Sequence, residues 1–249
     1  MKKIRDLIKK VILWIVVAFF ASTILSVAVL RWVPVWFTPL MFIRLAQQVS
    51  EGKELTLHHH WVPLEEIAPS LPTAVMASED ARFQEHHGFD YKAIEHAAMR
   101  NIKHPEKRKL GASTISQQTA KNVFLWPGRS WVRKGFEVYF TTLIELMWTK
   151  QRIMEVYLNS IEMGPQVFGA QAVAREHFNK DAADLTRSEC ILIAASFPNP
   201  IVHNTKKSPD KFLKRRQRRV ELNMKYIPSF PREGEDYDPG TAARGVYRK

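Results

Sequence analysis

The chain has 249 residues, of which 45% are hydrophobic, so it can bury one core of ordinary domain size beside an anchor but cannot hold two full enzymes. Its formal net charge of +12 indicates an anionic partner, which could be acidic lipid headgroups, nucleic acid or a phosphorylated substrate. The single cysteine, Cys190, excludes an intramolecular disulfide, and its apolar neighbours favour a buried thiol over a nucleophile.

Residues 11–30 form an uncharged and mainly apolar run of twenty residues. As a helix that rises about 1.5 Å per residue, this run is long enough for the roughly 30 Å hydrocarbon layer of a bilayer. Five basic residues precede it against one acid, whereas only Arg31 follows before Arg44. The positive-inside rule therefore predicts that the N-terminus is cytoplasmic and that the remainder is exported.

A cleaved signal peptide and a buried core helix are the alternatives to a transmembrane anchor. The apolar run is longer than the usual signal core, and residues 31–34 contain no small-residue cleavage site. These observations favour an uncleaved anchor. Trp32 and Trp36 would then lie at the outer interface of the membrane, where amphipathic aromatic rings are enriched.

The rest of the chain is predicted to be mainly helical, because apolar residues recur at helical spacing and alternating strand patterns are scarce. Residues 153–161 give one such helix, and residues 190–195 give a second, buried one. The triplet 58–60 is expected to be three solvated loop histidines, because consecutive side chains cannot easily converge on one metal ion. The expected organisation is a basic N-terminus at 1–10, an anchor at 11–31, a juxtamembrane segment at 32–60 interrupted by Pro34 and Pro39, a helical domain at 61–227 and a polar, peripheral tail at 228–249.

Glu79 is the first candidate for chemistry. It follows the apolar residues 74–77, so its carboxylate can stand at the edge of the core and face a cleft. Partial desolvation and a fixed position suit a general base. The alternative is an ordinary acid on a helix surface, and this segment alone favours that alternative, because the two kinds of carboxylate look alike in sequence.

Residues 111–122 form a second candidate segment, in which a helix cap precedes a polar helix face. Amide groups and one cation on such a face suit sugar hydroxyls and phosphate oxygens, and a merely solvated face is the alternative. The predicted substrate-binding residues of this segment are Ser113, Thr114, Gln117, Gln118, Lys121 and Asn122.

A third segment places the basic residues Arg129, Arg133 and Lys134 before Glu137. On a helix Arg133 and Glu137 share a face, so the guanidinium could hold the carboxylate and also reach an anion. The alternative is a surface ion pair worth only a few tenths of a kcal/mol. Farther along, Gly164 and Gly169 are expected to allow a tight turn and close helix packing.

Taken together, these segments resemble the five signature motifs of the peptidoglycan glycosyltransferase family, the lysozyme-like domain of bifunctional penicillin-binding proteins and of monofunctional wall polymerases. The motifs read EDARFQEHHGFD from Glu79, GASTISQQTAKN from Gly111, RKGFE from Arg133, KQRIMEVYLN from Lys150 and GPQVFGAQAVAREHFNK from Gly164. The likeness extends roughly from residue 61 to residue 224. Four positions depart from residues that are common in the family, namely Ser116, Thr119, His177 and Asn179.

The resemblance implies a mainly α-helical, lysozyme-like domain on a single N-terminal transmembrane helix, of the monofunctional, biosynthetic type. It implies that lipid II disaccharide units are joined to a growing lipid-linked strand by β-1,4 bonds, with inversion and release of polyprenyl pyrophosphate. Glu79 would be the general base, and Glu137 would orient phosphate-binding groups or a metal. The cations expected at the leaving pyrophosphate are Lys121, Arg129, Arg133 and Lys134. No cofactor is expected to be required, although Mg²⁺ or Mn²⁺ could accompany the pyrophosphate.

The expected location is the bacterial inner membrane, with the catalytic domain in the periplasm. Expected partners are the lipid bilayer, penicillin-binding transpeptidases and division proteins, but not nucleic acid. Three rival functions are a lysozyme-like lytic enzyme, an inactive scaffold, and a module in which the basic residues 206–219 bind nucleic acid or anionic lipid. The basic third segment argues against lysis, since cleavage of a neutral glycosidic bond has no pyrophosphate to neutralise. Export disfavours nucleic acid, so phospholipid headgroups are the expected partner of residues 206–219.

Overall fold

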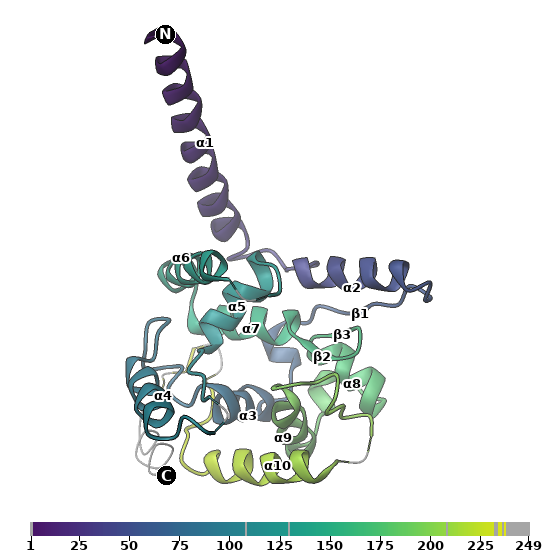
Figure 1. The fold of residues 1–249 in the computed structure, drawn as a ribbon. Helices are drawn as coiled ribbons and strands as arrows, with labels where there is room; N and C mark the ends of the chain where they lie inside the picture. The colour runs from purple at the N-terminus through teal and green to yellow at the C-terminus, as the bar shows by residue number, and fades with distance from the viewer. Residues whose placement is uncertain are drawn as a thin grey trace.

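The computed structural model describes residues 2–107, 109–128, 130–207, 209–231, 234–235 and 237. This part of the chain is mainly α-helical, as expected, with ten α-helices, two 3₁₀ helices and three short strands (Figure 1). In chain order the elements are α1 (Lys2–Val29), α2 (Pro39–Ser50), β1 (His58–His59), η1 (Leu64–Glu66), α3 (Ser70–Glu79), α4 (Tyr91–Lys103), α5 (Ile115–Phe124), α6 (Trp131–Met147), α7 (Lys150–Ser160), β2 (Glu162–Gly164), β3 (Val167–Phe168), α8 (Ala170–Phe178), η2 (Ala182–Asp184), α9 (Arg187–Ser196) and α10 (Lys211–Asn223).

Two groups of helices meet along one continuous hydrophobic core. The first group is α5, α6 and α7, and the second is α3, α9 and α10, which lies farther from α1 (Figure 1). Within the first group, α5 and α6 pack against α7, whose side chains Ile153, Met154, Tyr157 and Leu158 are fully buried. This burial confirms the helix that was predicted at residues 153–161.

Polar caps determine where several helices begin. Thr114 and Gln117 form a capping box at the start of α5, and Thr186 and Glu189 form another at the start of α9. Each threonine hydroxyl accepts a hydrogen bond from a backbone N–H that has no partner inside its helix. The predicted buried helix at 190–195 lies within α9. Burial raises the pKa of the Cys190 thiol to about 12, which agrees with a packing role.

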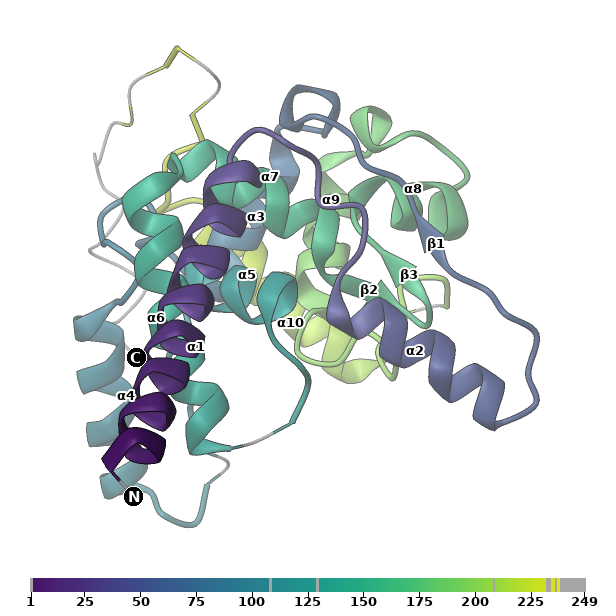
Figure 2. The ribbon, with the colours of Figure 1, turned by 90° about the horizontal axis from the view of Figure 1, so that it is seen from above.

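Helix α1 is long and apolar enough to cross a membrane, and most of its side chains are exposed. Its first half projects away from the other helices, whereas its second half packs on α6 (Figures 1 and 2). The Phe20 ring meets the Tyr139 ring of α6 edge to face, with centroids 5.7 Å apart. The Tyr139 hydroxyl also lies 2.8 Å from Thr23 Oγ1. The candidate anchor is therefore part of the packed domain at its C-terminal end.

The end of α1 is tied through backbone carbonyls to α7 and to Trp148, the residue that follows α6. Trp148 Nε1 donates a hydrogen bond to the Val27 carbonyl oxygen at 2.8 Å. Arg152 Nη2 donates to the carbonyl oxygen of Leu30 at 2.9 Å. Carbonyls in the last turn of a helix lack intrahelical partners, so these side chains satisfy groups that the helix itself cannot.

The segment between α1 and the domain differs from expectation at two places. Pro39 does not interrupt structure but begins α2, where its missing N–H is one that the first helical turn leaves unpaired. His58 and His59 form β1, paired in parallel with β3, so the expectation of a loop is wrong for these two residues, although His58 is exposed as expected. The partner strand lies more than 100 residues farther along the chain, and no local pattern could have revealed the pairing.

The two glycines expected to allow close packing do so. Gly169 has φ of +85°, and a Cβ there would lie 2.7 Å from the carbonyl oxygen of Asn159. A Cβ on Gly164 would lie 2.7 Å from Cε1 of His177. Gly169 therefore requires a residue without a side chain, whereas a side chain at Gly164 would require the His177 ring to move.

The beginning of the C-terminal tail also differs from expectation. Phe230 is buried rather than peripheral, and its ring stacks against Phe83. Its backbone N–H donates to Thr73 Oγ1 at 3.0 Å. The packed domain therefore includes Phe230, because an aromatic side chain in an otherwise polar segment supplies enough apolar surface to be buried. Most of the tail beyond Pro231 lies outside the described residues.

Candidate active site

Glu79 is the last residue of α3 and lines a cavity of about 210 Å³. Ala74, Val75, Met76 and Ala77 before it are buried, so the carboxylate stands at the edge of the core, as predicted. The cavity is bounded by the end of α3, by α4, by the loop before α5 and by Asn223 of α10. The Glu79 side chain is 17% exposed. It is accessible from the cavity without being fully hydrated, which suits a proton acceptor.

Three groups from three helices hold the Glu79 carboxylate. Ser78 Oγ of α3 lies 2.8 Å from Oε1, and Arg216 Nη2 of α10 lies 3.4 Å from the same oxygen. Gln118 Nε2 of α5 donates to Oε2 at 3.3 Å. Arg216 is itself fixed by a 2.9 Å hydrogen bond from Nε to the carbonyl oxygen of Ala195. The long contacts to Arg216 and Gln118 orient the carboxylate without occupying all of its lone pairs.

Tyr157 determines how Gln118 is oriented. The Tyr157 hydroxyl donates to Gln118 Oε1 at 3.1 Å, which leaves the amide NH₂ directed at Glu79. Burial, together with the nearby negative charges of Glu79 and Asp80, raises the pKa of Tyr157 well above its usual value. The hydroxyl therefore remains protonated and acts as the donor.

Glu137 occupies a different environment, in the first half of α6. It is buried, and its Oε2 accepts from Arg133 Nη1 at 2.7 Å while Oε1 forms an ion pair with Lys134. This confirms the pairing predicted from the four-residue spacing of Arg133 and Glu137. Each carboxylate oxygen is paired with a cation, so the arrangement is suited to holding positive charge at this place in the fold.

Lys121 of α5 lies within electrostatic range of both acids. Desolvation lowers the pKa of Lys121, Glu137 opposes that shift, and the positive charges of Arg133 and Lys134 reinforce it. Arg133 Nε is buried without a hydrogen-bond partner among the described residues. Three cations thus surround one buried carboxylate, which leaves an excess of positive charge and an unused donor for an anion.

The other predicted substrate-binding residues divide into two groups. Thr114 and Gln117 are buried and bonded to each other in the capping box of α5, so their side chains support the helix. Ser113 is exposed at the rim of the cavity, and Asn122 is half-buried on α5. Arg129 lies outside the described residues. The structure therefore brings Gln118 and Lys121 to the acids, together with Arg133 and Lys134.

Several residues that shape the site were not predicted, and Asp80 is one of them. His86 Nε2 lies 3.0 Å from each of its oxygens, and the Ile115 N–H donates to Oδ2 at 2.9 Å. Asp80 therefore fixes the start of α5 beside Glu79. Asp80 is next to Glu79 in the sequence, and this could have marked it as a site residue. Tyr157 and Arg216 are distant in sequence and join the site only through tertiary packing.

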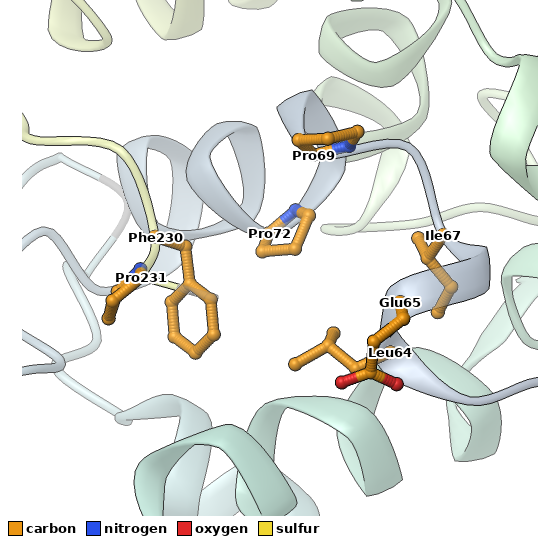
Figure 3. Close-up of a pocket in the computed structure, with 7 residues that line it drawn as sticks. All are labelled: Leu64, Glu65, Ile67, Pro69, Pro72, Phe230 and Pro231. Carbon is orange, nitrogen blue, oxygen red and sulfur yellow. The ribbon is translucent and has the colours of Figure 1, made fainter. Parts of the chain in front are cut away.

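Two further features of the structure, its possible metal ligands and its second cavity, were compared with the site around Glu79 and Glu137. Among the described residues, no group of three or more His, Cys, Asp or Glu side chains is placed to hold a metal ion. A second cavity, of about 60 Å³, is mainly apolar and contains none of the predicted site residues (Figure 3). Its lining is Leu64, Glu65, Ile67, Pro69, Pro72, Phe230 and Pro231. The site around Glu79 and Glu137 is therefore the better candidate for catalysis.

Comparisons with known proteins agree with this assignment. Residues 46–225 match the family model described as Transglycosylase. The chain is 57% identical over 227 residues to a biosynthetic peptidoglycan transglycosylase of Bacteroides thetaiotaomicron, with 90% of each chain covered. It is 51% identical to the protein of that name from Bdellovibrio bacteriovorus, over 89% of this chain and 88% of the relative. It is 46% identical to the protein of that name from Pseudomonas aeruginosa, over 92% of this chain and 93% of the relative. The chain belongs to the transglycosylase family.

Proposed function

We propose that this protein polymerises the glycan strands of peptidoglycan from lipid II. The observation that carries the proposal is the pairing of an accessible, oriented carboxylate at Glu79 with a separate group of cations around Glu137. A reaction that takes a proton from one substrate and expels a pyrophosphate from another requires both parts. The names of the relatives, biosynthetic peptidoglycan transglycosylases, agree with this substrate class.

In the proposed reaction, Glu79 accepts the proton of the acceptor's 4-hydroxyl as that oxygen attacks the anomeric carbon of the donor sugar. The bond between the anomeric carbon and the pyrophosphate oxygen breaks, and attack from the opposite face converts an α-linked donor into a β-1,4 bond. Lys121, Arg133 and Lys134 stabilise the negative charge that develops on the departing polyprenyl pyrophosphate. Such stabilisation is strongest where water is partly excluded, as around the buried Glu137.

A resident metal ion does not fit the described residues. The oxygens of Glu137 are occupied by Arg133 and Lys134, and those of Asp80 are occupied by His86 and a backbone N–H. A divalent cation such as Mg²⁺ or Mn²⁺ would therefore arrive with the substrate's pyrophosphate rather than occupy a site built by the protein.

The proposed location is the bacterial inner membrane, with the N-terminus in the cytoplasm and the domain in the periplasm. Five basic residues before the apolar part of α1, against only Arg31 between it and Arg44, support this orientation. Exposed aromatic side chains at Trp32, Trp36, Phe37 and Phe42 follow α1 and suit a membrane interface. Cross-linking of the strands would come from partner transpeptidases working alongside division proteins.

Two rival functions fit the site less well. A lytic enzyme of similar fold would have no use for three cations around a buried acid, because its substrate bond carries no charge. An inactive scaffold would have no need for a carboxylate held by side chains from three separate helices.

The proposal is tested by incubating the detergent-solubilised full chain with labelled lipid II and separating the products by length. We expect polymer that a muramidase degrades. A well-folded protein that produces no polymer in several detergents, with and without Mg²⁺ or Mn²⁺, would contradict the proposal and favour the scaffold.

A further inference from the structure

Helix α10 carries the most concentrated positive charge among the described helices of the folded domain. Its sequence KFLKRRQRRVELN contains six cations and one acid. Five of the cations are exposed and recur three, four, seven and eight residues after the first, which places them on one face. We call this face the α10 basic face, and it consists of Lys211, Lys214, Arg215, Arg218 and Arg219.

The α10 basic face has no partner within the part of the chain that the structure describes. None of its five residues forms an ion pair or side-chain hydrogen bond with another described residue, whereas Arg216 on the inner side of the helix contacts Ser78 and Glu79. Like charges held on one helix repel each other. Their concentration on one face therefore indicates an anionic ligand.

The position of α10 argues against the lipid bilayer as that ligand. Helix α10 lies at the end of the domain opposite to α1, α2 and α6 (Figure 1). Attraction to anionic headgroups falls off within a Debye length of about 8–10 Å. Contact between residues 206–219 and the headgroups of the membrane that holds α1, as the sequence suggested, is therefore not supported.

The same helix borders the catalytic cavity. Asn223 lines the cavity and its side-chain amide donates to the carbonyl oxygen of Ala77 at 2.9 Å. Arg216, from the middle of the helix, contacts Glu79. A polymer that leaves the cavity on the side away from α1 would therefore pass α10.

We propose that the α10 basic face binds the peptide stems of the growing glycan strand outside the cavity. This inference rests on the proposed function, since the strand is its product. The stems carry free carboxylates at regular intervals, so the strand is a polyanion that complements a row of exposed cations. Such contacts are individually weak and screened by salt, which suits a strand that must remain bound while it moves.

Binding is measured with the full chain in discs of zwitterionic lipid and with soluble, uncross-linked glycan strands that carry peptide stems. The charge-depleted variant combines Lys211→Gln, Lys214→Gln, Arg215→Gln, Arg218→Gln and Arg219→Gln. The matched control keeps every charge by combining Lys211→Arg, Lys214→Arg, Arg215→Lys, Arg218→Lys and Arg219→Lys. We expect the charge-depleted variant to bind at least about tenfold more weakly at low salt, and the control to bind like the native protein.

The ligand is identified by comparing two further probes. One is glycan strands stripped of their peptides by an amidase, and the other is vesicles of anionic phospholipid. We expect native protein to bind stripped strands more weakly than complete strands, because the amidase leaves only one lactyl carboxylate on each disaccharide in place of the carboxylates of the stem. Equal binding of stripped and complete strands would overturn the inference. The inference would also be overturned if the charge-depleted variant lost affinity for the vesicles but not for the strands.

Polymerisation of labelled lipid II by the same preparations separates this inference from the proposed function. We expect the charge-depleted variant to form the first glycosidic bond at the native rate but to release shorter strands. Native protein that polymerises but does not bind preformed strands contradicts only the inference. Native protein that makes no polymer contradicts the proposed function, whatever the binding measurement gives.

Discussion

Glu79 and Glu137 are two carboxylates of one site, and their surroundings differ in the number of cations that each one meets. Glu137 is buried between Arg133 and Lys134, with both oxygens occupied. Glu79 faces a cavity, and its contacts to Arg216 and Gln118 are 3.4 and 3.3 Å long. A buried carboxylate paired with two cations is placed to arrange charge, whereas one that faces a cavity can be reached by the hydroxyl whose proton it would accept. The residue type is the same, so the proposed difference in role comes from the surroundings: Glu137 is paired within its own helix, whereas Glu79 is contacted by side chains of α5 and α10.

The substitution Glu79→Gln is expected to have the largest effect on activity, and it tests the role proposed for Glu79. We expect polymerisation to fall by about 10² to 10⁴-fold, because the amide cannot accept the acceptor's proton. Thermal stability should change little, since Glu79 is partly exposed and the amide can retain the contact to Gln118. Glu95→Gln, an exposed substitution on α4, is the matched control and should polymerise normally. Normal turnover by Glu79→Gln in the labelled lipid II assay would remove Glu79 from the mechanism.

Glu137→Gln should damage both activity and stability, in contrast to Glu79→Gln. Removing one member of a buried ion pair leaves unpaired charge and typically costs about 3 kcal/mol or more. We expect a lower Tm in thermal unfolding, and inorganic pyrophosphate should recover part of the loss, because an anion can replace the missing carboxylate. If the two variants have the same Tm, and pyrophosphate stabilises neither, the proposed division of roles between the acids is wrong.

Tyr157→Phe tests the orientation of Glu79 without touching the carboxylate. Without the hydroxyl, the Gln118 amide loses the donor that directs its NH₂ toward Glu79. We expect kcat to fall by about tenfold with KM nearly unchanged, and stability to fall by about 1 kcal/mol. A double-mutant cycle with Gln118→Ala provides the control: the two losses should not add, because both act on one contact. Additive losses would mean that Tyr157 affects only packing.

The contrast between the two acids could be predicted only in part from the sequence. The Arg133–Glu137 pair follows from helical spacing, because both residues lie within α6 and local geometry brings them together. The long apolar helices and the buried run in α9 follow from periodicity in the same way. Short-range patterns of this kind need no knowledge of the fold.

The environment of Glu79 could not be obtained in this way. Arg216 and Tyr157 lie 137 and 78 positions farther along the chain than Glu79, and only the packing of α10 and α7 brings them near it. Gln117 and Gln118 are neighbours of the same type, yet one closes a capping box and the other contacts Glu79. A difference of one residue rotates a helical side chain by about 100°, so the sequence could indicate the face but not the role of each amide.

Lys121 is influenced by the charges of both Glu79 and Glu137. Its effects on the free energy of unfolding and on catalysis should change in opposite directions as the pH rises. Burial lowers the pKa of Lys121 below its usual 10.5, and unfolding restores the usual value. Between the lowered pKa and 10.5 the unfolded chain binds more protons, so the contribution of Lys121 to the free energy of unfolding rises with pH in that window. If Lys121 must be charged to stabilise the pyrophosphate, activity falls in the same window.

Lys121→Arg should extend activity to higher pH, because a guanidinium remains protonated there, and should abolish the rise in stability. The measurements are the pH dependence of the initial polymerisation rate and of chemical unfolding, each for native protein and variant. General alkaline unfolding would lower activity and stability together, whereas titration of Lys121 moves them in opposite directions. The same alkaline limit for native protein and variant would show that another group controls it, and would leave Arg133 and Lys134 as the cations that matter.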